Sequence, residues 1–259
     1  MYFDSHTHLN AKQLLDSLDN VLARAHKVGI VKMIVPSYDL PSVYNAISLS
    51  KQNTGIYAAI GIHPTDAKNY DVSILETLKE LVINNQEVKA IGEIGLDYYW
   101  DKSEDQRLFQ QEMFIRQIEL ANSLSLPVII HMRDASEDTL KIIREHLPKF
   151  GFVMHCFSGS KELMFALIEL GAFISFGGPV TFTNAVTPKE CVGLVPLNRL
   201  LIETDAPYLA PHPLRGKLNE PSNLVLINKQ IALLRNMSEE ELATITFNNA
   251  CDFFHVEKR

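Results

Sequence analysis

Eight short apolar runs, rich in Val, Ile, Phe and Tyr, recur along the 259-residue chain and are separated by longer amphipathic stretches. Runs that are apolar on both faces and alternate with such stretches are typical of a parallel sheet with crossover helices. A chain of this length with eight of them predicts a (β/α)8 TIM barrel of the α/β class. The runs span residues 2–6, 32–36, 56–62, 89–94, 127–131, 152–155, 172–176 and 199–203.

The stretches between the runs carry helical patterns. Apolar residues recur at helical spacing in 106–124 and 134–147, which predicts helices outside the barrel. Two further helices, 222–235 and 238–254, are predicted after a proline-containing loop. We expect Ser222 and Ser238 to be their N-caps, with Glu241 completing a capping box. No linker or composition shift interrupts the chain, so one domain over 1–259 is expected.

Unusual polar side chains fall at the carboxyl ends of these runs. In a β/α barrel those ends meet at one mouth, where active sites are built. Alternate strand residues point to one face, so His6 and His8 can hold the same ion. One histidine alone is more often a core or surface residue, but four histidines and two carboxylates at matching ends predict a metal site. The proposed ligands are His6, His8, Glu93, His131, His155 and Asp205.

Two carboxylates indicate the chemistry of this site. Glu93 lies in an apolar run, where an ionised carboxylate is costly unless it is paired or bound to a metal. No basic residue lies between Ile91 and Asp97, so bridging of two cations is favoured over a structural ion pair. Asp205 can bind a metal and accept the proton of an activated water, although a turn or N-cap role beside Pro207 is the simpler alternative.

Charge and cysteine content exclude several classes of protein. The chain has 24 Lys and Arg against 31 Asp and Glu, a net charge of −7, which argues against a generally basic nucleic-acid-binding surface. Three cysteines without CxxC spacing predict neither disulfides nor a thiolate zinc site, and we expect them to be buried. No signal-peptide or membrane-spanning pattern is present, so we expect a cytoplasmic protein without a membrane partner. Neither a protein partner nor an oligomeric state can be deduced.

At these residues the sequence resembles the TatD family of metal-dependent DNases, over essentially the whole chain. The matching segments are FDSHTHL (3–9), GIHP (61–64), IGEIGLDY (91–98), PVIIHMRDA (127–135), HCFSG (155–159) and LIETDAPYL (201–209). The resemblance implies that His6, His8 and Asp205 hold one ion, that His131 and His155 hold the other, and that Glu93 bridges them.

The resemblance also implies hydrolysis of DNA phosphodiesters, typically at 3′ ends. A water activated by two metals is expected to attack phosphorus, with Asp205, Glu93 and His63 as catalytic residues. His63 resembles a family histidine that contacts substrate phosphate or an extra ion, and ordering of the loop at Pro64 is an equal alternative. Arg133 and Arg215 are candidate phosphate contacts. Mg²⁺ is the expected metal, with Mn²⁺ or Zn²⁺ as alternatives.

Two other functions fit the same pattern less well. An ester hydrolase, such as a D-aminoacyl-tRNA deacylase, needs an extended basic surface for tRNA, and this acidic chain does not indicate one. A metal-stabilised scaffold that binds nucleic acid without cleaving it would fill its coordination with protein ligands. Six ligands shared by two ions leave positions open for water and substrate, which favours an enzyme.

Overall fold

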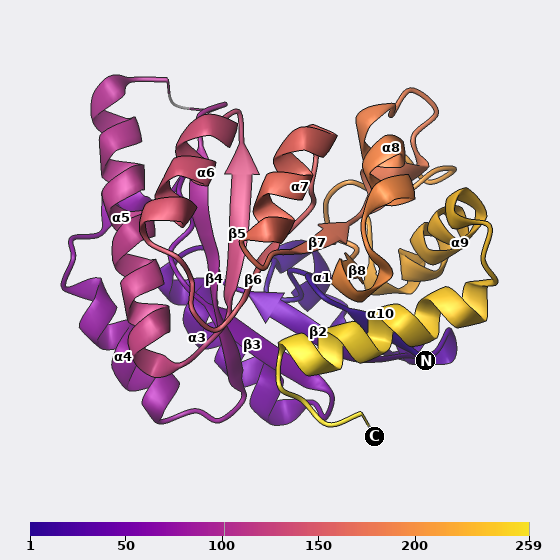
Figure 1. Ribbon diagram of the computed structural model, residues 1–259. Coiled ribbons are helices and arrows are strands. Elements are labelled where there is room, and N and C mark those ends of the chain that lie inside the picture. Colours follow the sequence, from indigo (N-terminus) through magenta and orange to yellow (C-terminus); the bar gives the residue numbers. More distant parts are fainter. Residues whose placement is uncertain (101, 259) are drawn as a thin grey trace.

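The computed structural model describes residues 1–100 and 102–258, which contain eight parallel strands in a nearly closed barrel (Figure 1). Strands pair in sequence order, and the Ser5 N–H donates to the Ile202 carbonyl at 3.2 Å, which brings the ends of the first and last strands together. The predicted TIM barrel is confirmed. Its strands are β1 (Tyr2–Asp4), β2 (Ile30–Pro36), β3 (Ile56–Ile60), β4 (Val88–Asp97), β5 (Val128–Arg133), β6 (Phe152–Met154), β7 (Phe173–Phe176) and β8 (Leu200–Ile202).

Helices follow the strands and cover the outside of the barrel (Figure 1). The segments predicted at 106–124 and 134–147 are α5 and the shorter α6. Among the described residues, no helix is long and apolar enough to cross a membrane. The α-helices are α1 (Lys12–Leu15), α2 (Leu18–Lys27), α3 (Leu40–Gln52), α4 (Ile74–Ile83), α5 (Glu104–Leu124), α6 (Ser136–Glu145), α7 (Lys161–Glu169), α8 (Thr187–Leu194), α9 (Leu224–Arg235) and α10 (Glu239–Phe253).

The two predicted N-caps have different outcomes. Ser238 is confirmed as the N-cap of α10, because its hydroxyl accepts from the Glu241 N–H at 3.1 Å. The prediction for Ser222 is wrong, because Ser222 lies within the 3-10 turn Pro221–Asn223 and α9 begins at Leu224. The Ser222 hydroxyl donates to the Glu220 carboxylate instead. A short turn before the helix thus replaced the predicted cap.

Every strand contributes at least one side chain to a cluster in the barrel interior, and α10 covers this cluster. The Phe3 ring lies 5.8 Å from that of Phe254 and 6.3 Å from that of Phe247, between ring centroids. A side chain at Gly151, just before β6, would meet the ring of Phe253. In Figure 1, α10 is the yellow helix that lies across the lower side of the barrel. This helix therefore closes the amino end of the barrel and leaves the carboxyl end as its mouth. The interior residues are Phe3, Ile34, Ala59, Ala90, Ile129, Val153, Phe173 and Leu201.

Two glycines on β4 allow a close approach to β5. A Cβ on Gly92 would lie 2.7 Å from the Cβ of Ile129. Gly95 has a φ of +140°, and a Cβ there would lie 2.0 Å from the His131 carbonyl oxygen. Only glycine suits such a backbone. The tight packing holds Glu93 on β4 next to His131 on β5.

Candidate metal centre

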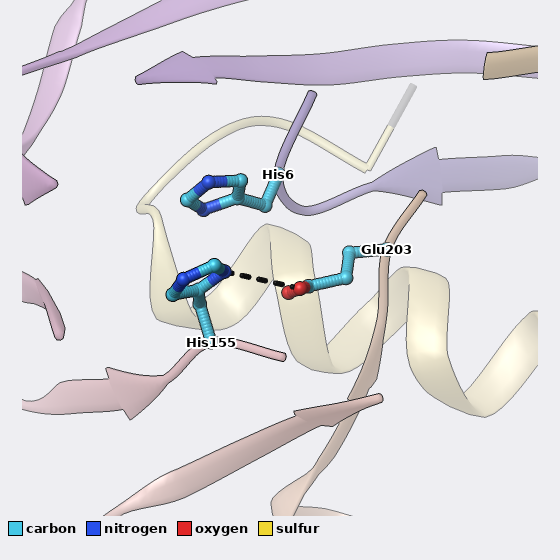
Figure 2. Close-up of side chains that lie close together, drawn as sticks. All are labelled: His6, His155 and Glu203. Carbon is cyan, nitrogen blue, oxygen red and sulfur yellow. Dashed lines mark hydrogen bonds and ion pairs between the residues drawn. The ribbon is translucent and has the colours of Figure 1, made fainter. Parts of the chain in front are cut away.

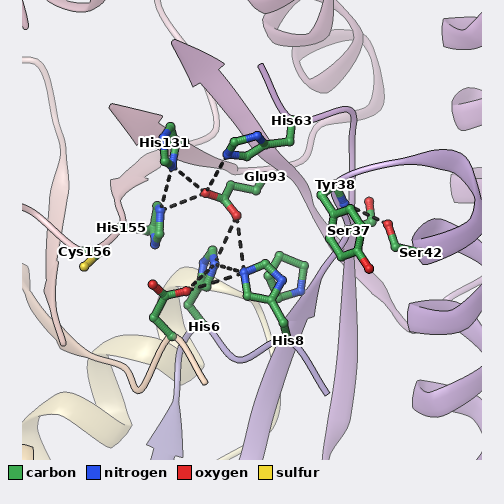
Figure 3. Close-up of polar contacts among 12 residues, drawn as sticks. His6, His8, Ser37, Tyr38, Ser42, His63, Glu93, His131, His155 and Cys156 are labelled. Atoms are coloured by element: carbon green, nitrogen blue, oxygen red, sulfur yellow. Dashed lines mark hydrogen bonds and ion pairs between the residues drawn. The ribbon is translucent and has the colours of Figure 1, made fainter. Parts of the chain in front are cut away.

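The Glu93 carboxylate lies at the centre of the barrel mouth, and its two oxygens face different imidazoles, Oε2 those of His6 and His8 and Oε1 those of His63, His131 and His155 (Figure 3). Oε2 lies 3.3 Å from Nε2 of His6 and 3.6 Å from Nε2 of His8. Oε1 lies 2.8 Å from Nδ1 of His131 and 2.8 Å from Nε2 of His155. One carboxylate therefore connects two separate sets of metal-ligating atoms.

Asp205 belongs to the set that contains His6 and His8. Its Oδ1 lies 3.8 Å from Nε2 of His6 and 3.5 Å from Nε2 of His8. The Asp205 backbone adopts a left-handed conformation with φ of +55°, and its N–H donates to the His6 carbonyl at 2.9 Å. Such a conformation is sparsely populated by non-glycine residues and is frequent at functional sites. The contact between the segments that follow β8 and β1 thus aims this carboxylate at the two histidines after β1.

Two further carboxylates orient the histidines of the other set. Asp97 Oδ2 contacts Nε2 of His131 at 3.0 Å, and Glu203 Oε1 contacts Nδ1 of His155 at 3.2 Å (Figure 2). Each bond leaves the other ring nitrogen directed at Glu93. Carboxylates that hold the far nitrogen of a ligating histidine fix its tautomer and ring orientation.

A third group of possible ligand atoms comprises His6, His155 and Glu203. Figure 2 shows the His6 ring stacked over that of His155. Their centroids are 4.0 Å apart and their planes are inclined by 13°. Nε2 of His155 faces Glu93, and Glu203 contacts the other ring nitrogen, Nδ1, which fixes the orientation of the ring. We therefore treat Glu203 as a positioning residue.

The protonation behaviour of the centre follows from its crowding. Burial opposes ionisation of Glu93, but the nearby imidazoles outweigh it and hold its pKa well below the usual range. Burial also lowers the pKa of His155, but Glu93 and Glu203 outweigh it and raise that pKa well above its ordinary value. The pKa of His63 is lowered by burial and by His131. The ionised Glu93 carboxylate is the form that divalent cations bind, whereas His155 has to release its proton before its Nε2 can bind one.

The donor set fits two divalent cations. The ligand atoms of His6, His8 and Glu93 lie within 4.8 Å of one another, as do those of His63, Glu93 and His131. Imidazole nitrogens with carboxylate oxygens suit Zn²⁺, Mn²⁺ or Mg²⁺ with retained water. The structure brings all six predicted ligands together, and their binding of metal stays a prediction.

A cavity of about 670 Å³ opens above the centre. His63 lies in its wall, with Nε2 3.5 Å from Glu93 Oε1 and Nδ1 2.7 Å from the Thr65 hydroxyl. Arg133 also lines this cavity. The other lining residues lie at or after the carboxyl ends of several strands and include Tyr38, Asp97, Trp100, Pro179 and Tyr208.

Comparison with known proteins identifies the family. The family model described as TatD related DNase matches residues 3–255. The chain belongs to the TatD family. It is 46% identical to the uncharacterized metal-dependent hydrolase YabD of Bacillus subtilis, over 99% of this chain and 100% of that one. It is 39% identical to the uncharacterized metal-dependent hydrolase YcfH of Escherichia coli K12, over 98% and 96% of the two chains. The solved structure of YjjV, a TatD homologue from Escherichia coli, superposes with a TM-score of 0.93 at 31% identity, covering 99% of this chain and 98% of that one.

Within this TatD-family chain, two of the predictions from sequence need correction or restriction. Cys191 and Cys251 are buried as predicted, but Cys156 is only partly buried and lines the cavity, because it follows β6 at the mouth. Arg215 is not among the cavity-lining residues of the described chain, and its guanidinium lies 4.4 Å from the centre of the Phe182 ring. Its proposed phosphate contact receives no support from this position.

Asp97 is the functional-site residue that sequence reasoning did not single out. Asp97 could have been found from the alternation of strand side chains, because Glu93, Gly95 and Asp97 share one face of β4. A carboxylate four residues beyond a proposed ligand, on the same strand face, indicates a partner for a neighbouring histidine. The tertiary contact with His131 identifies which histidine it is.

Proposed function

We propose that this TatD-family protein is a metal-dependent deoxyribonuclease that removes nucleotides from single-stranded 3′ ends, with Mg²⁺ as the expected metal. The observation that carries the proposal is the division of the Glu93 oxygens between two sets of ligands. A carboxylate in that arrangement would let the two sets of residues hold two divalent cations side by side, as two-metal hydrolysis of phosphodiesters requires. The description of the matching family model as a DNase supports the choice of substrate.

The charge balance of the centre favours an anionic substrate. Two divalent cations contribute four positive charges and their ligands Glu93 and Asp205 remove two, so the ions and their direct ligands keep a net positive charge, which Asp97 and Glu203 behind the histidines reduce in the wider centre. Among the described cavity-lining residues, Arg133 is the one Arg or Lys. The positive charge that would attract a phosphate is therefore concentrated at the metal centre, which forms the floor of the cavity.

Each residue has a defined part in the proposed reaction. Bound divalent ions supply Lewis acidity that lowers the pKa of a water and neutralises charge on phosphate. Asp205, 8% exposed and bordering the cavity, accepts the proton released as water attacks phosphorus. His63 contacts a phosphate oxygen of the substrate from the cavity wall. Asp97 and Glu203 keep His131 and His155 oriented during turnover.

The size of the cavity favours an unpaired strand end. A volume of about 670 Å³ is that of a small-ligand pocket and takes a nucleotide rather than a duplex. The activity test is to incubate the metal-loaded protein with end-labelled single-stranded DNA and RNA, each blocked at its 3′ or 5′ end. We expect shortening of DNA with a free 3′ end and none with a chelator. Release of amino acid from a D-aminoacyl-tRNA, without cleavage of any strand, would replace the nuclease by the ester hydrolase.

The number of metals is tested by substitution at the bridge. Wild-type protein should bind about two divalent ions per chain, measured by elemental analysis after mild loading. Glu93→Ala should weaken both sites, because both sets of ligands face this carboxylate. His131→Ala is the matched control and should weaken mainly one site. A fully active wild-type protein with one ion would refute the two-metal assignment.

A further inference from the structure

Trp100 is the single tryptophan of the chain, and it stands exposed at the edge of the cavity. It follows β4, 70% of its surface is accessible, and it borders both the main cavity and a smaller neighbouring one of about 100 Å³. Large apolar groups exposed beside a functional cavity mark binding surfaces more often than isolated surface residues do. The mechanism proposed above gives Trp100 no part.

The position of Trp100 is tied to the metal centre through Asp97. One oxygen of Asp97 contacts His131 Nε2 at 3.0 Å, and the other accepts from the Tyr99 N–H at 3.0 Å. The Tyr99 ring meets the Trp100 ring edge to face, with centroids 4.8 Å apart at 89°. The Arg133 guanidinium lies 3.8 Å from the centre of the Tyr99 ring and 5.5 Å from that of Trp100. These contacts are at distances typical of cation–π and edge-to-face pairs.

We infer that Trp100 is a stacking platform for the nucleobase of the strand end whose phosphate is cleaved. The inference rests on the proposed nuclease function, because the phosphate is held at the floor of the same cavity. A ligand that binds the metal centre at one end of this cavity and packs on Trp100 at the other carries an anion and a flat aromatic group, as a nucleotide does. Stacking on an aromatic ring tolerates every base, so this contact holds a strand end without reading its sequence.

The single tryptophan provides a direct test of binding. Emission of the metal-loaded protein is recorded during titration with thymidine 5′-monophosphate and, separately, with deoxyribose 5-phosphate, which has the phosphate but no base. We expect quenching by the nucleotide and little or none by the sugar phosphate. Unchanged emission when calorimetry shows that the nucleotide is bound would overturn the inference. Equal quenching by both compounds would overturn it too.

Variants of Trp100 separate stacking from apolar packing. On single-stranded DNA, Trp100→Leu should lower kcat/KM by roughly tenfold, the scale of one base–aromatic contact. Trp100→Phe should restore most of that loss. The exposed Phe165 on α7 lies outside the cavity lining, so Phe165→Ala is the matched control and should behave as wild type.

A substrate without the terminal base completes the design. On a strand whose last nucleotide is abasic, the Trp100→Leu variant and the wild type should have the same kcat/KM. An equal loss on both strands, or no loss on either, would overturn the platform. Failure of the wild type to cleave any strand would refute the nuclease instead, and the fluorescence titration would still decide whether Trp100 contacts a base.

Discussion

Asp205 and Glu93 are both buried carboxylates of the centre. Glu93 lies between the two sets of histidines, whereas Asp205 lies beside one set only. Burial opposes ionisation of Asp205, whereas the His8 contact and the neighbouring imidazoles outweigh it and lower its pKa, so it is ionised at neutral pH. Asp205→Asn keeps the shape and one ligating oxygen but removes the proton acceptor. We expect kcat to fall roughly a hundredfold while metal stays at least partly bound. Steady-state kinetics with elemental analysis measures both, and near-normal kcat at full metal occupancy would show that another group is the base.

At the scale of elements, α10 is the part of the fold that closes the barrel away from the mouth. Phe254, directly after α10, is fully buried and its ring centroid lies 5.8 Å from that of Phe3. Phe254→Ala should lower the free energy of unfolding by about 3–5 kcal/mol, because it leaves a cavity against the interior cluster. Urea unfolding measures the loss, and the exposed Phe165→Ala should change it by no more than about 0.5 kcal/mol. A Phe254→Ala protein as stable as wild type would mean that α10 does not brace the barrel.

At the scale of the whole molecule, a rise in pH should strengthen metal binding and should destabilise the metal-free fold. The pKa values of His131 and His155 are raised in the metal-free fold, where burial is outweighed by Asp97 and Glu93 for the first and by Glu93 and Glu203 for the second. Their stabilising contribution is fully present below an unfolded pKa of about 6.5 and is lost as pH rises through the folded values. Metal binding requires neutral imidazoles and therefore gains with pH.

The difference in Tm between metal-loaded and metal-free protein should consequently widen from about pH 6 to pH 8. Thermal unfolding in matched buffers, with and without chelator, measures this difference at each pH. His155→Gln removes one of the two titrating imidazoles and should reduce the widening. If the difference in Tm stayed constant across the range, metal binding would not release protons from His131 and His155.

Much of the fold and centre was predictable because β/α barrels place local patterns in fixed positions. Apolar runs report strands wherever both faces are covered, and polar residues at their ends must meet at the mouth. The positions of His6 and His8 just after β1 and of His131 on β5 followed from these local patterns, although Glu93 is 87 residues from His6 and 38 from His131 along the chain. The contact between the segments that follow β8 and β1, which turns Asp205 toward His6 and His8, was not visible in any local pattern.

The sequence by itself determined the barrel, the eight strands to within about three residues at their ends, and the six candidate ligands, because each depends on the period and chemistry of a short segment. Only the tertiary structure decided which oxygen of Glu93 faces which histidines, and that Asp97 supports His131. It also decided that Ser222 lies in a turn and that Cys156 lines the cavity. These features depend on distances between segments far apart in the chain, and such distances are set by the packing of the whole barrel rather than by any local run of residues.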